Sequence, residues 1–545
     1  MNEQDEDLVK TLLQRQQEME SDRLPWESQW RDIDRRVNPT GDGGFTPKAP
    51  SQRGLENFDV TAIEGLDRFC AVIAALSIPR KSIWHGLEFS DPELMKIDAV
   101  KRWCETATRR LFAMRYASST GFTVQGYEDI QQLGGYGTAP LWIFERPGKG
   151  LGYKTLHLSE VFIDEDFTGR VDTVHRKFEL SARQAAQQFG VDALPPKVRE
   201  AYADPKKCEN RFQFLHVVRP NPKIEPDRFD WRAKPIESLY IGIDEKWIIQ
   251  RGGFWSFPIA VSRNATSPRD KYGRSPAMKV IAGIKTVNEM AKTLLRGAHK
   301  AVDPPIAFHD DGDISRLALK PGGLNPGLID QMGRALVKPI ELGGALPFGM
   351  EILEQERAPI RKSFLEEFFT LLSNPSDRMT ATQVLETLRK EGVLVAPFAD
   401  RYEAEKLTPL VMRELDIAMR AKQLPPLPAE VIEAGAKAQP VMTNPLSRMA
   451  RAEEAAGFTR WTEVAVQLAA FDEEVMDVVD TEAGLRGVAE VLGVPPTWIR
   501  SPADVAARRE ARVAAKEEAQ LLEGAPKAAG AVLDLARASE ISGAV

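Results

Sequence analysis

The sequence predicts an α+β protein that is mainly helical, with a β-rich part between residues 150 and 262. Three observations lead to this class. Apolar residues recur at three- and four-residue spacing over most of the chain, which is typical of amphipathic helices. Between 150 and 262 this changes to short β-branched and aromatic runs separated by turns. The chain has 545 residues, more than one hydrophobic core usually supports, so we expect two or more packing units.

Residues 1–145 are predicted to be mostly helical. Trp26, Trp30 and Ile33 recur at four- and three-residue spacing, and a helix of small residues from Ile63 to Ile78 ends before a proline. Residues 134–137 contain three glycines, which we interpret as a turn between two elements. No Lys-Ser or Lys-Thr follows them, so the phosphate-binding loop of an ATPase is absent.

The β-rich part is predicted to be antiparallel, with one helix inserted at Ser181–Phe189. The expected strands are Val161–Ile163, Val171–Phe178, Phe212–Val218, Leu239–Ile243, Trp247–Gln250 and Phe257–Val261.

Two long helices are predicted to bracket a Gly/Pro-rich insertion at residues 303–350. The first begins at Ser275-Pro276, because serine can cap the free N–H groups and proline is tolerated in the first turn, and it ends before Asp303. The second is expected from about Glu356 to Leu372, where apolar residues repeat every four positions.

A polar loop follows at residues 373–379. Thr380 and Gln383 then match a capping box, and a helix is expected to continue from them. A further helix is predicted from Arg401 to Lys422, before Pro425-Pro426. The C-terminal part reads as Ala/Glu-rich helix, and we expect it to fray from residue 526.

Charge and cysteine content limit the classes of function. The formal net charge is −7, whereas a protein that grips duplex DNA is usually basic. An acidic balance still suits a conduit through which DNA slides. Three scattered cysteines give no disulfide framework, so a reducing interior suits the chain. The N-terminus lacks the features of a secretory signal, and no apolar run approaches the roughly 20 residues that span a bilayer.

No catalytic, cofactor-binding or metal-binding residue is predicted. Residues 164–172 partly match a calcium loop through Asp164, Asp166 and Asp172, but position 12 of the loop is His175 instead of a glutamate. A hairpin turn is the favoured interpretation, and a metal-dependent nuclease using the three aspartates is an alternative. The six histidines are dispersed, and no G-x-S-x-G motif supports a catalytic triad.

The first long helix carries its charge on one side. Lys285, Lys292 and Arg296 share a face, with a single acid, Glu289, along the helix. Such a row is either a solvated helix face or a set of cations that can touch DNA phosphates.

Several motifs in order resemble the head-to-tail connector (portal) protein family of short-tailed phages. The run Tyr272–Pro276 resembles the Y-G-R-S motif that opens the family's stem helix. Gly65-Leu66 with the helix ending at Pro79, and Trp84 after it, resemble its N-terminal motif. Three further matches are Arg378–Thr382 with Glu386, Thr443–Arg448 and Val491–Val494. The resemblance extends from about Leu12 to Trp498.

The resemblance implies a portal-type subunit with a β-rich wing part, two long stem helices, a clip insertion and a helical crown. The implied boundaries are wing 1–270, first stem helix 271–302, clip 303–354, second stem helix 355–373, tunnel loop 374–381, wing and channel helices 382–421, crown 422–510 and C-terminal tail 511–545. The chain departs from the family's pattern at Gly392–Pro397, which interrupts the helix after the loop.

The implied function is structural: a ring, expected to have twelve subunits, at one capsid vertex of the virion, made in the bacterial cytoplasm. Its implied partners are the terminase large subunit, tail adaptor and nozzle proteins, capsid and scaffolding proteins, and double-stranded DNA held non-specifically. No cofactor and no membrane are implied. A capsid or tail adaptor without a DNA channel is an alternative.

The tunnel loop is expected to hold further channel residues. Arg378 either meets passing phosphates or pairs with a neighbouring acid such as Asp377. The remaining loop candidates are Asn374, Pro375, Ser376, Met379 and Thr380.

Overall fold

The computed structural model describes most of the chain, in two compact units, Met1–Ala450 and Arg451–Val545. The described residues are 3–40, 44–45, 49–146, 148, 150–308, 329, 332–335, 337–339, 346–366, 396–450, 452–469, 478–492, 498, 500 and 504–515. The fold is α+β, as the sequence predicts.

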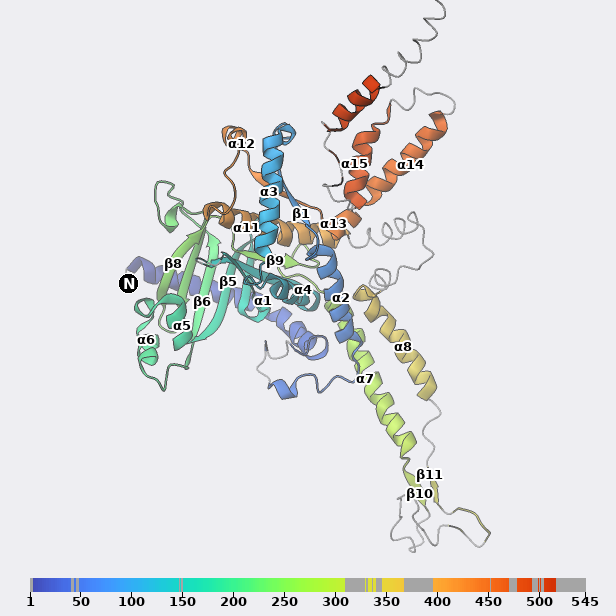
Figure 1. Ribbon diagram of the computed structural model, residues 1–545. Helices are drawn as coiled ribbons and strands as arrows, with labels where there is room; N and C mark the ends of the chain where they lie inside the picture. The colour runs from blue at the N-terminus through green and yellow to red at the C-terminus, as the bar shows by residue number, and fades with distance from the viewer. Residues whose placement is uncertain are drawn as a thin grey trace, which may run out of the picture. The chain divides into compact units, whose positions relative to one another are not determined.

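A five-stranded antiparallel sheet forms the outer part of the first unit, and its strands lie in chain order. The strands are β4 (Val161–Glu165), β5 (Val171–Ser181), β6 (Arg211–Pro220), β7 (Ile236–Gly242) and β8 (Trp247–Phe254). Side chains alternate between the two faces, so Leu215 packs against Leu12 of α1 (Glu3–Arg36), while Phe214 packs against α5 (Ala182–Phe189) and α6 (Pro196–Ala203). Figure 1 shows α1 crossing one face and α5 and α6 covering the other.

A three-stranded sheet lies beside it, in the order β3 (Gly150–Thr155), β2 (Thr138–Arg146), β9 (Ile259–Arg263). Helices α3 (Asp98–Arg115), α4 (Phe122–Tyr136) and α11 (Thr408–Arg420) pack around it. One core cluster joins these elements through buried residues that include Leu111, Ile143 and Val411. A π-helical turn, Glu403–Leu407, leads into α11.

Two long helices extend away from the sheets, side by side (Figure 1). They are α7 (Pro276–Val302) and α8 (Leu346–Ser363), and α2 (Thr61–Ser77) packs against both near the sheets. At the far end of α7, β10 (Ile306–Phe308) pairs antiparallel with β11 (Val337–Pro339). Phe69, Ile284 and Phe364 lie in the core that joins the three helices.

The first unit is closed by a segment from late in the sequence. β1 (His85–Phe89) pairs antiparallel with β12 (Ala438–Met442), and α13 (Pro445–Ala450) packs against α2. The short helix α12 (Ala429–Ala434) precedes β12. Residues 422–450, assigned above to a crown by resemblance, therefore pack with the N-terminal part of the same chain.

The second unit is helical where it is described. α14 (Ala452–Ala469) packs against α15 (Thr481–Leu492), and Glu482 forms ion pairs with Arg486 and with Arg509 of a helix over 504–515. Within the described ranges, the other short elements are 3-10 turns at Pro50–Gln52, Leu94–Lys96, Leu158–Glu160, Val191–Ala193 and Trp231–Ala233.

Most predicted elements are confirmed. All six predicted strands are present, and Ser181 caps α5 in a capping box with Gln184. The interpretation of residues 134–137 as a turn is wrong for its first three residues, which end α4, while Gly137 caps that helix. The prediction that residues 1–145 are mostly helical did not include the strands β1 and β2. The second long helix begins at Leu346 instead of near Glu356.

Candidate functional site

The base of α7 is formed by the run Tyr272–Pro276. Ser275 Oγ accepts a hydrogen bond from the backbone N–H of Met278 at 3.0 Å and caps the helix, as predicted. Arg274 donates to Asp270 and lies 5.1 Å from the centre of the Trp26 ring. The motif therefore fixes where and in which direction α7 leaves the sheets.

Tyr272 anchors this junction in an aromatic cluster. Its ring meets Trp30 edge-on at 5.3 Å between centroids and Trp26 at 6.0 Å, and its hydroxyl accepts from the N–H of Ile163 at 3.3 Å. Burial raises the pKa of Tyr272, so the phenol stays neutral and acts as a packing and hydrogen-bonding group. One side chain thus connects α1, β4 and α7.

Two glycines allow two backbone segments to touch at the same junction. A Cβ on Gly273 would lie 2.2 Å from the carbonyl oxygen of Gly137, and a Cβ on Gly137 would lie 2.3 Å from that of Gly273. Gly137 also has a φ of 82°, which L side chains rarely adopt. The N–H of Gly273 donates to Thr138 Oγ1 at 2.8 Å. The start of α7 is therefore fastened directly to the turn between α4 and β2.

The predicted basic row on α7 is present, but its cations differ in their surroundings. Lys285 is exposed and lies 2.6 Å from Asp32 at the end of α1. Lys292 lies 3.5 Å from Glu289 and 5.5 Å from the centre of the Phe58 ring. Arg296 is exposed, further toward the β10–β11 end. Two of the three candidate phosphate contacts thus have partners within their own chain.

The loop candidates Asn374, Pro375, Ser376, Asp377, Arg378, Met379 and Thr380 lie outside the described residues. The predicted capping box at Thr380 and Gln383 lies outside them as well.

Helix α11 and the turn before it are held to α3 and α4 by buried charges that sequence reasoning missed. Arg115 of α3 and Glu414 of α11 are both 0% exposed, and their closest N–O distance is 2.5 Å. Tyr153 donates to Glu414 at 2.7 Å, and the guanidinium of Arg115 stacks 4.3 Å from the centre of the Trp84 ring. A pair this dry is stable only because each remaining polar atom has a partner.

A second buried pair lies in the π-helical turn. Lys406 donates to Asp129 of α4 at 2.7 Å and to the carbonyl oxygens of Ala139 and Ala260 at 3.0 and 2.8 Å. Burial raises the pKa of Asp129 to about 6 and lowers that of Lys406. One ammonium group thereby connects α4, β2, β9 and the approach to α11.

A sequence signal for Arg115–Glu414 existed. Arg413 and Glu414 interrupt the apolar stripe Leu410, Val411, Leu415 of α11, and a charged residue on a buried helix face requires a partner. The identity of the partner could not be found, because Arg115 lies in a distant helix.

The acidic run 164–172 forms the predicted hairpin turn. β4 and β5 pair antiparallel around it, and Gly169 has a φ of 82°. Asp164 forms ion pairs with Arg15 and Lys271, and Asp166 accepts from the N–H groups of Thr168 and Arg170. These contacts occupy two of the three carboxylates that the nuclease alternative requires, those of Asp164 and Asp166.

The histidines that the structure describes differ in burial. His85, His157, His175 and His216 are buried or nearly so, whereas His299 is exposed on α7. Burial lowers the pKa of His175 to about 4 and that of His216 to about 3, so both are neutral near pH 7. Their contacts, to Gln16 and Ser238, are structural.

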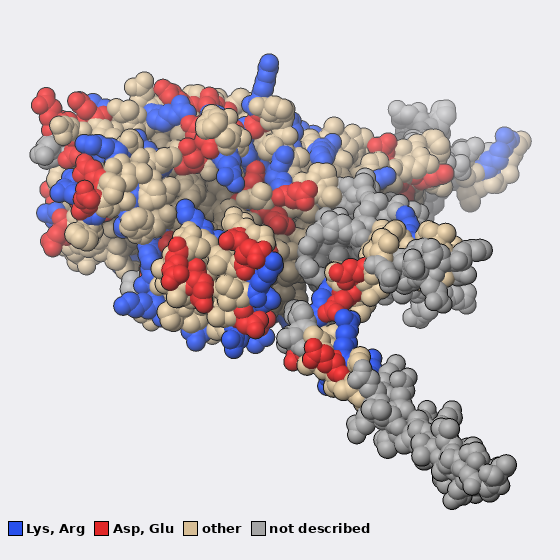
Figure 2. Space-filling view, turned by 90° about the horizontal axis from the view of Figure 1, so that it is seen from above, with Lys and Arg blue, Asp and Glu red and all other residues tan. Residues whose placement is uncertain are grey.

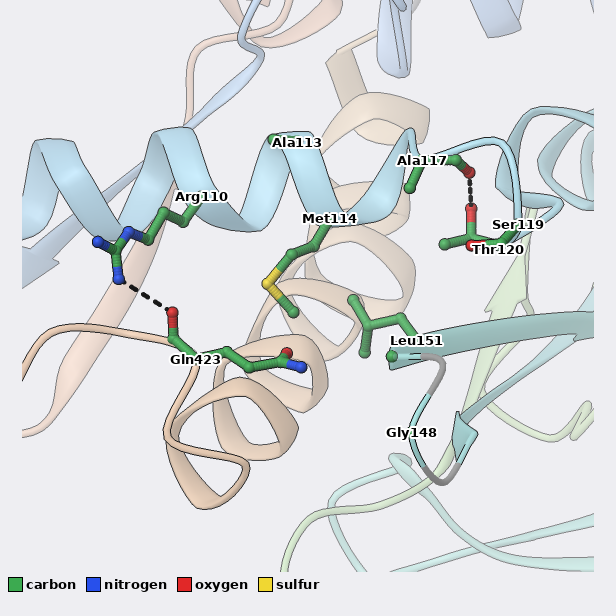
Figure 3. A pocket seen from close by; sticks show the side chains of 10 residues that line it. Arg110, Ala113, Met114, Ala117, Ser119, Thr120, Gly148, Leu151 and Gln423 are labelled. Carbon is green, nitrogen blue, oxygen red and sulfur yellow. Dashed lines mark hydrogen bonds between the residues drawn. The ribbon is translucent and has the colours of Figure 1, made fainter.

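A pocket of about 480 Å³ lies at the end of α3, beside the β2–β3 turn (Figure 3). Met114 and Leu151 form its apolar wall, and Arg110 reaches across its edge to the carbonyl oxygen of Gln423 at 3.1 Å. Thr120 donates to Ala117 O instead of pointing its hydroxyl proton into the space. The pocket offers van der Waals contacts, with no titratable pair at its wall.

The charge pattern of the visible surface is mixed. On the face drawn in Figure 2, Lys and Arg side chains are interspersed with Asp and Glu. Among the described residues, no group of three or more His, Cys, Asp or Glu side chains could hold a metal ion, and none of their helices is long and apolar enough to cross a membrane.

Known proteins are similar to this chain over nearly its whole length. The family described as bacteriophage head to tail connecting protein matches residues 9–499. A portal protein of Salmonella phage epsilon15 is 25% identical over 94% of this chain and 92% of its own, and a probable portal protein of Bordetella phage BPP-1 is 26% identical over 95% and 94%.

A solved structure, the virion of a native gene transfer agent particle, covers 79% of this chain and 94% of its own. Its TM-score is 0.32 at 13% sequence identity.

Proposed function

Because this chain belongs to the family of bacteriophage head to tail connecting proteins, we propose that it assembles into a closed ring at one capsid vertex. Double-stranded DNA would enter and leave through the channel of this ring, held only by non-specific contacts. We propose twelve subunits, and a place in the virion after synthesis in the bacterial cytoplasm. The function is that of a portal subunit: a passage and a docking platform.

The observation that carries this proposal is the α7–α8 pair. It extends from the sheets, it is fixed at its base by the Tyr272–Pro276 junction, and it exposes apolar side chains such as Leu295 and Met350 along its length. Exposed apolar side chains that lie together on one surface are typical of protein–protein contact surfaces. A ring of such pairs would bury them between neighbours and form a tube.

The division of labour along the chain is part of the proposal. Residues 1–270 would form the wing, α7 and α8 the stem, 303–354 the clip, and the segment from about 422 to 510 the crown. The clip would dock the terminase large subunit during packaging and tail adaptor and nozzle proteins afterwards. Capsid and scaffolding proteins would contact the wing. The motor's ATP would supply the energy, so the subunit itself would catalyse nothing.

Purification of the full chain tests this directly. We expect closed rings in end-on electron micrographs and a discrete multiple of the 60.6 kDa subunit mass by native mass spectrometry. The same preparation should neither hydrolyse ATP nor cleave DNA, and Asp164→Ala should change neither result. A chain that remains monomeric at micromolar concentration at all salt concentrations would contradict the ring.

A further inference from the structure

The α7–α8 pair presents two different surfaces at the same position along its length. This position is the point where Gly349 of α8 meets α7. A Cβ on Gly349 would lie 2.5 Å from Leu294 Cδ2, so the two helices touch here. On one side of this crossing lies an apolar groove of about 600 Å³. Its walls are Met290, Thr293, Leu294 and Gly349, and its charged edge is Lys285 and Glu289.

The other side carries two exposed apolar side chains. Leu295 of α7 is 49% exposed and Met350 of α8 is 65% exposed. Leu295 follows Leu294 directly, and Met350 follows Gly349 directly. Because each helix turns by about 100° per residue, neither of them shares the direction of the residue before it.

Contacts of both helices with residues 58–59 place Leu295 and Met350 on the same side of the pair. On α7, Asn288, Lys292 and Leu295 form a stripe at four- and three-residue spacing. The Oδ1 of Asn288 accepts from the N–H of Phe58 at 2.8 Å, and Lys292 lies over the Phe58 ring. Leu295 continues this stripe toward β10.

On α8, Met350, Glu354 and Arg357 form the equivalent stripe. Arg357 donates to Asp59 at 2.5 Å and to Glu354 at 3.2 Å. The stripes of both helices thus face residues 58–59, and their uncovered ends are Leu295 and Met350. We call these two side chains the knob and the opposite side the groove.

We propose that the knob of one subunit inserts into the groove of the next, and that this contact sets the head-to-tail order of subunits around the ring. This rests on the proposed function. Rotation about a ring axis leaves the height along that axis unchanged, so surfaces that meet around a ring must lie at one height. Knob and groove meet this condition, because both are set by the Leu294–Gly349 crossing.

The occupant is a second copy of this chain, for two reasons. The two surfaces are both apolar and lie on opposite sides of one helix pair, which is the arrangement that a head-to-tail interface requires and a two-fold symmetric one does not. The groove also has too few polar groups to orient a small polar ligand. Its lining, which includes Thr286 as well, supplies two threonine hydroxyls and the charges of Lys285 and Glu289.

Two variants test the proposal. The knob variant is Leu295→Glu with Met350→Glu, which would place two carboxylates in an apolar groove. The groove variant is Thr293→Glu with Met290→Glu, which would fill the groove with negative charge that also repels the carboxylates of the knob variant. We expect each variant to lose rings by about tenfold or more at a concentration where the wild type is fully assembled, because a buried unpaired charge opposes association. Circular dichroism should show native helix content for both.

Mixing the two variants gives the sharpest result. The knob variant keeps an intact groove and the groove variant keeps an intact knob, so one competent interface remains per mixed pair. We expect heterodimers of one copy each by native mass spectrometry, and no rings. Phe229→Glu, a fully exposed position outside the stem, is the control and should assemble normally.

Normal rings from either variant, or loss of rings in the Phe229→Glu control as well, would overturn the knob-and-groove contact. So would a mixture that gives no heterodimer. Each of these outcomes leaves the proposed ring itself intact, because that is judged on the wild-type chain alone.

Discussion

At the scale of the residue, the junction at the base of α7 depends on the absence of two side chains. Gly137 and Gly273 bring two backbone segments so close that a single methyl group on either would overlap a carbonyl oxygen of the other. The Ser275 cap and the buried Tyr272 then fix the direction in which α7 leaves the sheets. The glycines therefore determine whether the start of α7 can lie against the turn between α4 and β2.

We predict that Gly273→Ala lowers the free energy of unfolding by more than about 2 kcal/mol, because overlap with backbone atoms cannot be relieved by a side-chain rotation. Gly137→Ala should cost at least as much, since it adds a strained φ. The control is Gly283→Ala within α7, where a Cβ meets nothing within 4 Å, and a gain of about 0.5–1 kcal/mol is expected. Urea unfolding followed by fluorescence measures all three. Equal behaviour of the variants at Gly273 and Gly283 would show that the close approach is unimportant.

At the scale of the element, α8 and α11 differ in how they are held. α8 packs against α7 and α2 largely through apolar side chains such as Leu353, Ile360 and Phe364. α11 and its π-helical turn are fixed by the buried pairs Arg115–Glu414 and Lys406–Asp129. Separating the buried pairs of α11 would leave unpaired charges out of water, whereas Arg357, which joins α8 to Asp59, keeps 28% of its side chain exposed.

We propose that Arg378, in the loop at 374–381, contacts DNA in the channel. We predict that Arg378→Glu leaves ring assembly intact and shortens the packaged or retained genome. Each solvated arginine–phosphate contact is worth at most about 1 kcal/mol, so many copies together can hinder backsliding without stopping DNA.

Genome length in purified particles measures this effect, with Asp377→Asn as the matched control. Full-length DNA in Arg378→Glu particles would show that Arg378 does not restrain the DNA. Failure to form rings would mean that the loop shapes the subunit instead, for example through a pair between Arg378 and Asp377.

At the scale of the whole molecule, acid should weaken the fold through its buried histidines. Burial lowers the pKa of His175 to about 4 and of His216 to about 3, and it lowers that of His85 as well. In the unfolded chain these groups titrate near 6.5. Below that pH the unfolded chain binds protons that the folded chain does not, so stability falls as the pH falls from about 6.5 toward 4.

We predict a slope of about 1.4 kcal/mol per pH unit for each such histidine within this window. His175→Gln should reduce the slope by that amount, while the exposed His299→Gln should leave it unchanged. Urea unfolding at pH 7, 6 and 5 provides the comparison. A wild-type stability that does not vary over this range would show that these histidines protonate in the folded state.

The sequence by itself determined the class, the main elements and the family. Hydrophobic period separates helix from strand locally, and a capped start such as Ser275-Pro276 is legible because all its groups are within one turn of chain. The prediction failed where the pattern was ambiguous over a short run. Residues 134–135 continue α4, with Leu66 and Phe69 packed against Gly134 and Ile33 beside Gly135, and no local signal in the sequence reports that packing.

Only the tertiary structure decided which distant residues meet. Three ion pairs, Glu414–Arg115, Lys406–Asp129 and Lys285–Asp32, each join residues more than two hundred positions apart in the sequence. Sequence pattern gives the face on which a charge lies, but the partner across that face depends on how whole elements dock. The same reason explains the knob and groove. Leu294 and Leu295 are neighbours in the sequence and both belong to the apolar pattern of α7. In the folded structure Leu294 contacts Gly349, whereas Leu295 is exposed.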